Sequence, residues 1–355
     1  MKSLILMLFL PAAFAAEPKL EELKLPPGYK ISVYAHPVKN ARSLTLGSDG
    51  TVYVGTRSEG NVYALLPDKN GDGRSDETVT IAKGLNMPNG VAFKDGALYI
   101  AEVSQVSVIK DITKNLRSAK LEKFGAKFPH DEHHGWKFIA FGPDGWLYVP
   151  VGAPCNICNK NENLYAAIHK VSPDGKKREL VAKGVRNTVG FDWQPGTNDF
   201  WFTENGRDWM GDEQPPCELN RLEKAGAHYG YPFCHGTNVL DPEFGKGKSC
   251  KDYVAPKFEF TAHAAPLGMR FMKNEKLKNS VLVAEHGSWN RSELVGYQVT
   301  KIEVNGKNAG KAEPFITGFK NGKSVWGRPV DVLELPDGSI LVSDDVANAV
   351  YRVTR

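Results

Sequence analysis

A recurring β-hairpin is the feature that most constrains the fold of this chain. Each copy has an apolar strand with period-two alternation, a tight turn containing Asp or Gly, and a second strand of the LYV type. Six copies occur, and they begin at Ser43, Gly90, Phe138, Val189, Leu267 and Val330. The first three copies are evenly spaced and the later gaps are longer, as loop insertions into a repeat produce.

Further strand-like segments follow most copies, so each unit is expected to hold about four strands. Four-stranded sheets repeated around an axis form a β-propeller. The sequence therefore predicts an all-β fold, a six-bladed β-propeller of four-stranded antiparallel blades, as one domain over residues 17–355. The segment from Tyr29 to Ala35 is expected to join the blade built from the C-terminal strands, because this closes the ring and removes a free edge. A β-sandwich is the alternative.

The first sixteen residues have the pattern of a cleaved secretory signal peptide. A positive start is followed by a short apolar run and then by small residues at cleavage spacing. This run is too short to span a bilayer, and no later segment is apolar enough to do so. The mature chain is thus expected in the periplasm or outside the cell. The net charge of +4 includes no basic block, which argues against nucleic acid as a partner.

The five cysteines fit an exported protein with disulfides. The preferred pairing is Cys155 with Cys158 and Cys234 with Cys250, leaving Cys217 free, although spacing alone does not determine connectivity. The CxxC is followed by Asn159 rather than His, which disfavours covalent haem attachment. A zinc site would need a second ligand pair, and none has the right spacing.

A loop with the pattern DxNxDGxxDE, starting at Asp68, is typical of calcium binding. Side-chain oxygens at alternate positions suit a hard cation, and Gly73 permits the sharp turn. The predicted ligands are Asp68, Asn70, Asp72, Asp76 and the carbonyl of Arg74. The alternative is a solvated acidic turn without an ion.

Three histidines and two acids precede the third hairpin, in the segment PHDEHHG. Histidine suits general-base chemistry near neutral pH, and an adjacent carboxylate can orient the ring. We expect one of these histidines to act as the general base. We expect His130, and after it His133, to be ordinary hydrogen-bonding loop residues. A zinc site is the rival, but no fourth ligand is evident nearby.

Cationic residues occur at similar places in several repeats. Arg186 precedes the fourth hairpin, Arg328 opens the sixth, and Arg291 lies in the segment that follows the fifth. Equivalent edges of propeller blades meet at the central channel, where guanidinium groups would bind an anionic ligand. A single arginine of this kind would more often be a surface group.

Several segments, in this order, resemble the soluble quinoprotein sugar dehydrogenases: HHGWKFIAFGPDG, GVRNTVGFDW, ENGRD with ELN, HYGYP, APLGMRF and RPVDVLELPDG. The segments APCNIC and EHGSWNR are similar to the sorbosone dehydrogenase-like branch. The resemblance covers nearly the whole chain after residue 16. It implies oxidation of an aldose, a sorbosone-like aldehyde or a related polyol with pyrroloquinoline quinone (PQQ) and Ca²⁺, and an external electron acceptor.

The resemblance also implies roles for individual residues. His134 would be the general base that takes the proton from the sugar hydroxyl as hydride passes to the quinone. Arg186 and Asn187 would hold the cofactor. The backbone carbonyls of Gly206 and Arg207 would bind a catalytic calcium ion that polarises the quinone.

Two positions depart from the family pattern. Arg328 matches the first arginine of the RxRDV motif, but Val330 replaces the second. The cofactor-binding lysine has no clear counterpart, and Arg291 is the candidate for its role. Two other functions therefore stay open: a lactonase-like hydrolase on the same architecture, and a non-catalytic propeller that binds a ligand without the cofactor.

Overall fold

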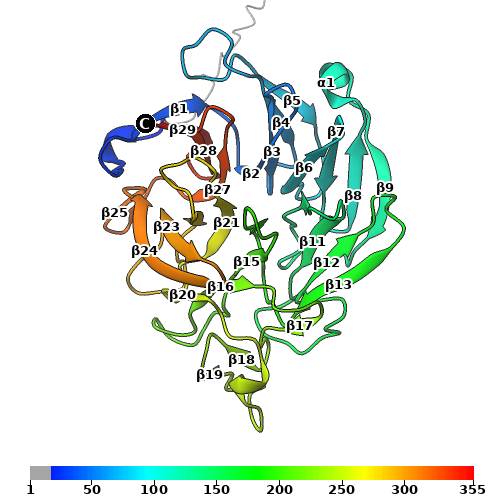
Figure 1. Ribbon diagram of the computed structural model, residues 1–355, viewed down its shortest axis with the longest axis vertical. Helices are drawn as coiled ribbons and strands as arrows, with labels where there is room; N and C mark the ends of the chain where they lie inside the picture. Colours follow the sequence, from blue (N-terminus) through cyan, green and yellow to red (C-terminus); the bar gives the residue numbers. More distant parts are fainter. Residues whose placement is uncertain (1–16) are drawn as a thin grey trace, which may run out of the picture.

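The computed structural model describes residues 17–355 and confirms the six-bladed β-propeller (Figure 1). Blade 1 contains β2 (Ala41–Leu46), β3 (Val52–Thr56), β4 (Val62–Leu65) and β5 (Thr78–Ala82). Blade 2 contains β6 (Gly90–Lys94), β7 (Ala97–Ala101), β8 (Gln105–Ile109) and β9 (Glu122–Lys127). Blade 3 contains β10 (Ala140–Phe141), β11 (Leu147–Val151), β12 (Ala167–Val171) and β13 (Arg178–Lys183).

The second half of the ring follows the same plan. Blade 4 contains β14 (Phe191–Trp193), β15 (Phe200–Glu204), β16 (Cys217–Arg221) and β20 (Phe258–Phe260). Blade 5 contains β21 (Pro266–Phe271), β22 (Ser280–Glu285), β23 (Gln298–Asn305) and β24 (Asn308–Ile316). Blade 6 contains β27 (Pro329–Glu334), β28 (Ile340–Asp344), β29 (Ala349–Thr354) and β1 (Lys30–Ala35).

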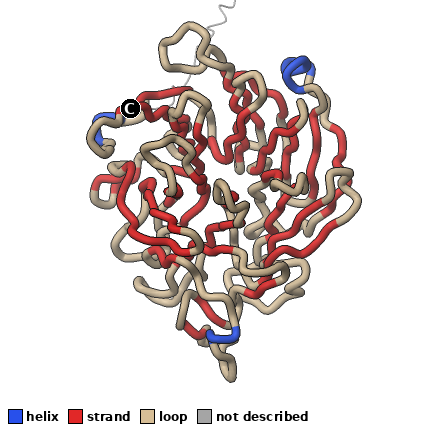
Figure 2. Tube along the Cα trace, in the orientation of Figure 1, coloured by secondary structure: helices blue, strands red, loops and turns tan. Residues whose placement is uncertain are grey.

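Helical structure is scarce among the described residues, as Figure 2 shows. It consists of α1 (Ile112–Asn115) and the 3-10 turns η1 (Leu20–Glu22), η2 (Leu116–Ser118) and η3 (Cys250–Asp252). Two short strand pairs lie outside the blades: β18 (Cys234–His235) with β19 (Val239–Leu240), and β25 (Lys320–Asn321) with β26 (Ser324–Val325). No helix within residues 17–355 is long and apolar enough to cross a membrane. The expected signal peptide lies outside the described residues.

The ring closes as predicted. Strand β1 pairs with β29 in antiparallel register, with Lys30 opposite Thr354 and Ile31 opposite Val353. The last blade is therefore completed by a strand from the other end of the chain. Strand β29 is thereby paired on both sides, with β28 and with β1.

The PDG and SDG turns explain why the hairpins recur. The Asp side chain accepts a hydrogen bond from the backbone two residues later, at 2.9 Å for Asp337 to Ser339 and 3.1 Å for Asp49 to Thr51. The glycine between them adopts positive φ, at +81° for Gly338 and +83° for Gly50. Positive φ strains most other residues, so Asp-Gly selects this turn.

Blade 3 departs from the hairpin predicted to begin at Phe138. Its first strand, β10, begins only at Ala140, and just before it the carbonyl of Lys137 accepts a hydrogen bond from the Asn89 side chain at 2.9 Å. This blade also gains a fifth strand, since β17 (Ala227–His228) pairs in parallel with β13. Strand β17 belongs to an insertion between β16 and β20 that reaches back to the preceding blade (Figure 1).

Both predicted disulfides are present. Cys155 bonds to Cys158, Cys234 bonds to Cys250, and Cys217 is free and buried in β16. The second bond closes the insertion of blade 4 on itself. The first closes a loop that follows β11 directly.

Aromatic and aliphatic side chains fill the space between neighbouring blades. Between blades 3 and 4, for example, Phe138 packs edge-on against Phe191, with ring centroids 4.8 Å apart. Lys137 is buried at 1% exposure with its Nζ 5.4 Å from the centre of the Phe128 ring, and Nζ donates to the Gly135 carbonyl at 2.7 Å. Burial lowers the pKa of Lys137 to about 7, so the charged form is costly inside the fold.

Lys137→Met is expected to stabilise the protein most at low pH. The folded pKa lies below the unfolded one, so the cost of burying the charge is fully present below pH 7 and vanishes above about pH 10. That cost is on the order of 4 kcal/mol, and losing the bond to Gly135 returns about 1 kcal/mol. Denaturant unfolding at pH 6 and pH 10 should show a larger gain at pH 6. The exposed control Lys114→Met should show no such difference, and an equal gain at both pH values would contradict this account.

Candidate active site

A cavity of about 210 Å³ lies where the blades meet, and five of the predicted site residues line it. His134, Arg186, Asn187, Gly206 and Arg328 come from blades 3, 4 and 6 and reach the same space. The lining set also includes residues that the sequence reasoning missed: Arg42, Arg57, Trp136, Asn205, Asp208, His263, His286 and Trp289.

His134 is the most deeply buried titratable group of the histidine cluster. Its Nδ1 lies 2.9 Å from the Ala153 carbonyl, which can only accept, so Nδ1 carries the proton and Nε2 keeps its lone pair. Burial, helped by the neighbouring Arg186 and His133, holds the pKa of His134 well below its usual value. The ring is therefore neutral at pH 7 and suited to accept a proton.

The expectation that a carboxylate orients this histidine is wrong. Asp131 instead accepts a hydrogen bond from the Tyr165 hydroxyl at 2.6 Å, and the Ala153 carbonyl takes the orienting role. The backbone of His134 adopts φ of +51°, an uncommon conformation for a side chain of this size. His133 packs edge-on against His134, with centroids 4.2 Å apart, and does not line the cavity.

Arg186 forms the wall of the cavity beside His134. A guanidinium has five N–H donors, and here all five are used by protein acceptors. They bond the Asn156 carbonyl and side chain, the Asn205 and Gly206 carbonyls, and the Asp208 carboxylate, at 2.7 to 3.1 Å. Arg186 therefore organises the site in this conformation rather than presenting a free donor to a ligand.

Two other guanidinium groups in the cavity have no carboxylate partner among residues 17–355. Arg57 lies 4.2 Å above the Trp136 ring, and Arg328 donates from Nε to the His286 carbonyl at 2.9 Å. Burial and then the nearby charge of Arg42 lower the pKa of Arg57. Positive charges gathered in a partly buried cavity favour an anionic ligand.

Arg42 belongs to a neutralised network on the same wall. Its Nη1 contacts Asp345 at 2.7 Å, and the other oxygen of Asp345 lies 2.8 Å from His286 Nε2. Burial lowers the pKa of His286 to about 4, so this ring is neutral. The surplus positive charge in the cavity thus comes from Arg57 and Arg328.

These residues fit an anionic, acceptor-rich cofactor such as PQQ. Besides the two guanidinium groups that lack a carboxylate partner, the buried indole N–H of Trp136 has no hydrogen-bond partner within residues 17–355. A buried donor without a partner costs free energy that a ligand acceptor would recover. The cavity therefore offers both charge and hydrogen bonds to a planar polyanion.

The same wall does not fit a calcium ion at Gly206. The carbonyl predicted as a calcium ligand accepts from Arg186 Nη1 at 2.8 Å, so a guanidinium already lies against it. The side chain of Arg207 turns away and pairs with Asp241 at 2.7 Å and Glu243 at 3.0 Å. In the conformation of the described residues, no three His, Cys, Asp or Glu side chains are gathered as metal ligands, and this includes the loop starting at Asp68, whose side-chain oxygens accept from its own backbone. The lactonase-like alternative requires such a donor set at the cavity.

Arg291, the candidate for the cofactor lysine, does not line the cavity. Its guanidinium contacts the Asp212 carbonyl and the Glu213 carboxylate on a neighbouring loop. The repeat itself could have pointed to Arg42 and Arg57 instead. Arg42 lies directly before the first hairpin copy, which starts at Ser43. Arg57 directly follows β3, as Asn205 follows β15 in blade 4.

The loop starting at Asp68 joins β4 to β5, and none of its residues lines the cavity. The Asp68 carboxylate accepts backbone hydrogen bonds from Gly71 and Gly73 at 2.8 Å and contacts Arg352 at 3.1 Å. Asn70 and Asp72 each accept from the backbone two residues later, at 2.8 Å. The loop is thus folded into a compact turn on its own side-chain oxygens.

Comparisons with known proteins agree with the fold and the motifs. Residues 163–325 match the family described as TrAA12-like. An uncharacterized protein of Borreliella burgdorferi is 35% identical over 362 residues, covering 96% of this chain and 92% of the relative.

Solved structures share the propeller at low identity. A Trichoderma reesei protein of carbohydrate-active enzyme family AA12 has a TM-score of 0.82 at 19% identity, covering 98% of this chain and 99% of the other. The PQQ domain of pyranose dehydrogenase from Coprinopsis cinerea, in its holo form, has a TM-score of 0.78 at 17% identity, with 96% and 98% covered. The PQQ-bound aldose sugar dehydrogenase of Streptomyces coelicolor has a TM-score of 0.66 at 18% identity, with 93% and 99% covered.

The family match over residues 163–325 and the ordered motifs indicate the same group, and the solved relatives share its fold. The resemblance stated from HHGWKFIAFGPDG and the segments that follow it is therefore confirmed. The chain belongs to the TrAA12-like family of the soluble quinoprotein sugar dehydrogenases.

Proposed function

We propose that this chain is an exported PQQ-dependent dehydrogenase that oxidises a sugar and passes the electrons to an external acceptor. The observation that carries the proposal is one cavity holding a buried, neutral histidine together with the unpaired guanidinium groups of Arg57 and Arg328. The names of the structural relatives support the same reaction class.

In this proposal His134 acts on the substrate hydroxyl. Nε2 accepts the hydroxyl proton, while Ala153 keeps the other ring nitrogen protonated and the ring oriented. PQQ, when bound, would supply the acceptor for the hydride that leaves the carbon bearing this hydroxyl. Arg57, Arg328 and the Trp136 indole would hold the cofactor carboxylates and carbonyl oxygens.

An exposed aromatic pair supports a sugar as the substrate. Trp289 lines the cavity and packs edge-on against Trp209, with ring centroids 5.3 Å apart. Their exposures of 63% and 67% are high for tryptophan in a folded protein. Apolar faces of sugar rings pack on such surfaces, while the sugar hydroxyls stay solvated.

The test is reconstitution of the purified protein with PQQ, followed by dye-linked oxidation of a panel of aldoses, ketoaldehydes and polyols. Turnover with at least one sugar, dependent on added PQQ, is the expected result. Absence of both PQQ binding and turnover on every panel member would favour the non-catalytic alternative. Lactone hydrolysis without PQQ would favour the hydrolase.

We also propose that the loop from Asp68 to Asp76 binds calcium and that this ion is structural. Millimolar Ca²⁺ should raise the melting temperature, since a ligand at a hundred times its Kd stabilises the folded state by about 2.7 kcal/mol. Chelation with EDTA should reverse the rise. Asp72→Asn should abolish the response and the exposed-turn control Asp95→Asn should keep it. An unchanged calcium response in Asp72→Asn would overturn this assignment.

A further inference from the structure

The short loop closed by the Cys155–Cys158 disulfide touches both key groups of the cavity. At its start, the Ala153 carbonyl accepts from His134 Nδ1 at 2.9 Å, and the Ala153 N–H donates to the Arg186 carbonyl at 2.8 Å. Inside the ring, the Asn156 carbonyl and side chain accept from Arg186 Nε and Nη2 at 2.7 and 2.8 Å. A six-residue segment thus contacts the candidate base and the guanidinium beside it.

Both ends of the Asn156 side-chain amide are engaged in this arrangement. Its side-chain oxygen also accepts from the Asp208 N–H at 2.8 Å, and its amide donates to the Asp208 carbonyl at 3.1 Å. Asp208 in turn contacts Arg186 at 3.1 Å. Asn156 therefore ties the loop of blade 3 to the loop of blade 4 that faces it.

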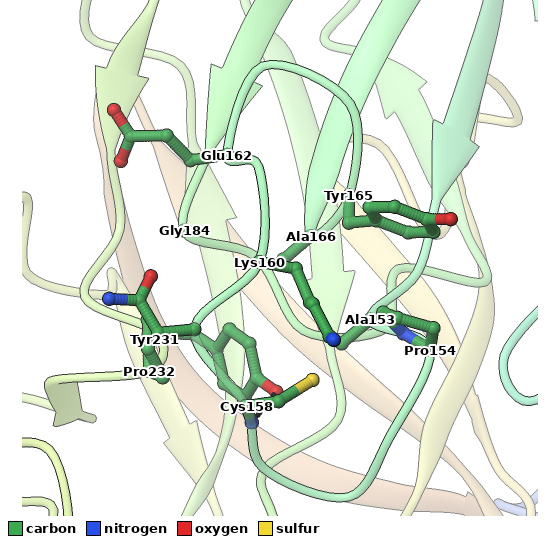
Figure 3. Close-up of a pocket in the computed structure, with 11 residues that line it drawn as sticks. Ala153, Pro154, Cys158, Lys160, Glu162, Tyr165, Ala166, Gly184, Tyr231 and Pro232 are labelled. Atoms are coloured by element: carbon green, nitrogen blue, oxygen red, sulfur yellow. Dashed lines mark hydrogen bonds between the residues drawn. The ribbon is translucent and has the colours of Figure 1, made fainter. Parts of the chain in front are cut away.

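The disulfide holds Asn156 in place from both sides. The Tyr231 hydroxyl accepts from the Cys158 N–H at 3.0 Å and lies 3.5 Å from the Cys155 sulfur. Figure 3 shows Tyr231 beside Cys158, with Ala153 and Pro154 on the opposite side of a small pocket. A covalent ring this small leaves its two inner residues few alternative conformations.

We propose that the disulfide-closed loop from Ala153 to Cys158 is the positioning element of the active site, and that Asn156 is its positioning residue. It holds Arg186 against the cavity wall and His134 in its reactive orientation. The positioning role rests on the proposed function, in which His134 is the base. Its test measures the titration of His134 and does not require turnover.

The charged and titratable groups facing His134 are His133, Arg57 and Arg186. Of these, Arg186 is the one that Asn156 holds. Moving a guanidinium away from an imidazole removes repulsion with the protonated ring, so protonation of His134 should become easier. A loop with a merely structural role would lower the melting temperature without this effect.

The test is an NMR titration of His134 in ¹³C-histidine-labelled full-length protein, with no cofactor added. Asn156→Ala is expected to raise the proton affinity of His134 about tenfold, and Cys155→Ser with Cys158→Ser should act in the same direction. Asn159→Ala is the matched control, because Asn159 is exposed, lies just outside the ring and should leave the titration unchanged. His134→Asn identifies the His134 signal by removing it.

PQQ affinity is the second readout, measured by quenching of tryptophan fluorescence from Trp136 and Trp289. Asn156→Ala should weaken PQQ binding about tenfold relative to Asn159→Ala. If His134 titrates and PQQ binds alike in Asn156→Ala and the parent protein, the proposal is overturned. If the parent binds no PQQ but the titration shifts as expected, the positioning role stands and the proposed function fails. Should the cysteine double variant not fold, Asn156→Ala alone decides.

Discussion

His134→Asn is expected to lower sugar turnover by about 10²- to 10⁴-fold, which is the usual contribution of a positioned general base. Asn is chosen because it tolerates the positive φ of 51° at this position and its amide can still donate to the Ala153 carbonyl. The fold and the cavity wall should therefore survive while Nε2 is lost. Steady-state oxidation of the best sugar in the panel, at saturating PQQ, measures the effect.

The matched control is His133→Asn, since His133 packs against His134 without lining the cavity. It should retain turnover within tenfold of the parent, and both variants should bind PQQ within about threefold of the parent.

The pH profile of turnover provides a second check on His134 as the base. Because the pKa of His134 is held well below 6.5, turnover should be flat from pH 8 to pH 6 and be lost only at more acidic pH. A turnover loss centred above pH 6.5 would identify a different base.

Arg57→Gln is expected to weaken PQQ binding by about 10- to 100-fold, as the loss of a hydrogen-bonded contact with a charged group does. Arg57 has no carboxylate partner in the described chain, and Arg42 and Arg328 add to the positive charge around it. An anion bound there relieves this repulsion. Fluorescence titration with PQQ at low and high ionic strength measures the change.

The comparison variant is Arg117→Gln, an exposed arginine paired with Glu77 on the surface, which should bind PQQ like the parent. Added salt should weaken PQQ binding more steeply in the parent than in Arg57→Gln, because one cationic contact is absent in the variant. Equal affinity in Arg57→Gln and the parent would show that the anion contacts lie elsewhere in the cavity.

The propeller was predictable because its information is local and repeated. Each hairpin carries its own period-two alternation and its own Asp-Gly turn, so six copies indicate six blades without any long-range contact. Ring closure by the segment from Tyr29 to Ala35 followed from the need to remove a strand edge. The parallel pairing of β17 with β13 was not predictable, since it depends on where an insertion of blade 4 happens to dock.

The site was predictable in part, for a different reason. Motif order identified His134, Arg186 and Arg328, and all three line the cavity. What the motifs could not supply is how each group is used. The five hydrogen bonds of Arg186 join three separate loops, so its engagement by Asn156 and the carbonyl of Gly206 appears only in three dimensions. Arg57 lies outside every recognised motif, and only its place in the repeat could have suggested it.

The central claim is that a sugar delivers electrons to PQQ bound in this cavity, and an absorption spectrum tests it most directly. The purified protein is mixed with PQQ and Ca²⁺, freed of excess cofactor, and then given a sugar without any other acceptor. The account predicts that the PQQ absorption stays with the protein and that the oxidised band bleaches when the sugar is added, in the parent but not in His134→Asn. PQQ that washes away, or a retained band that no sugar bleaches, would contradict it.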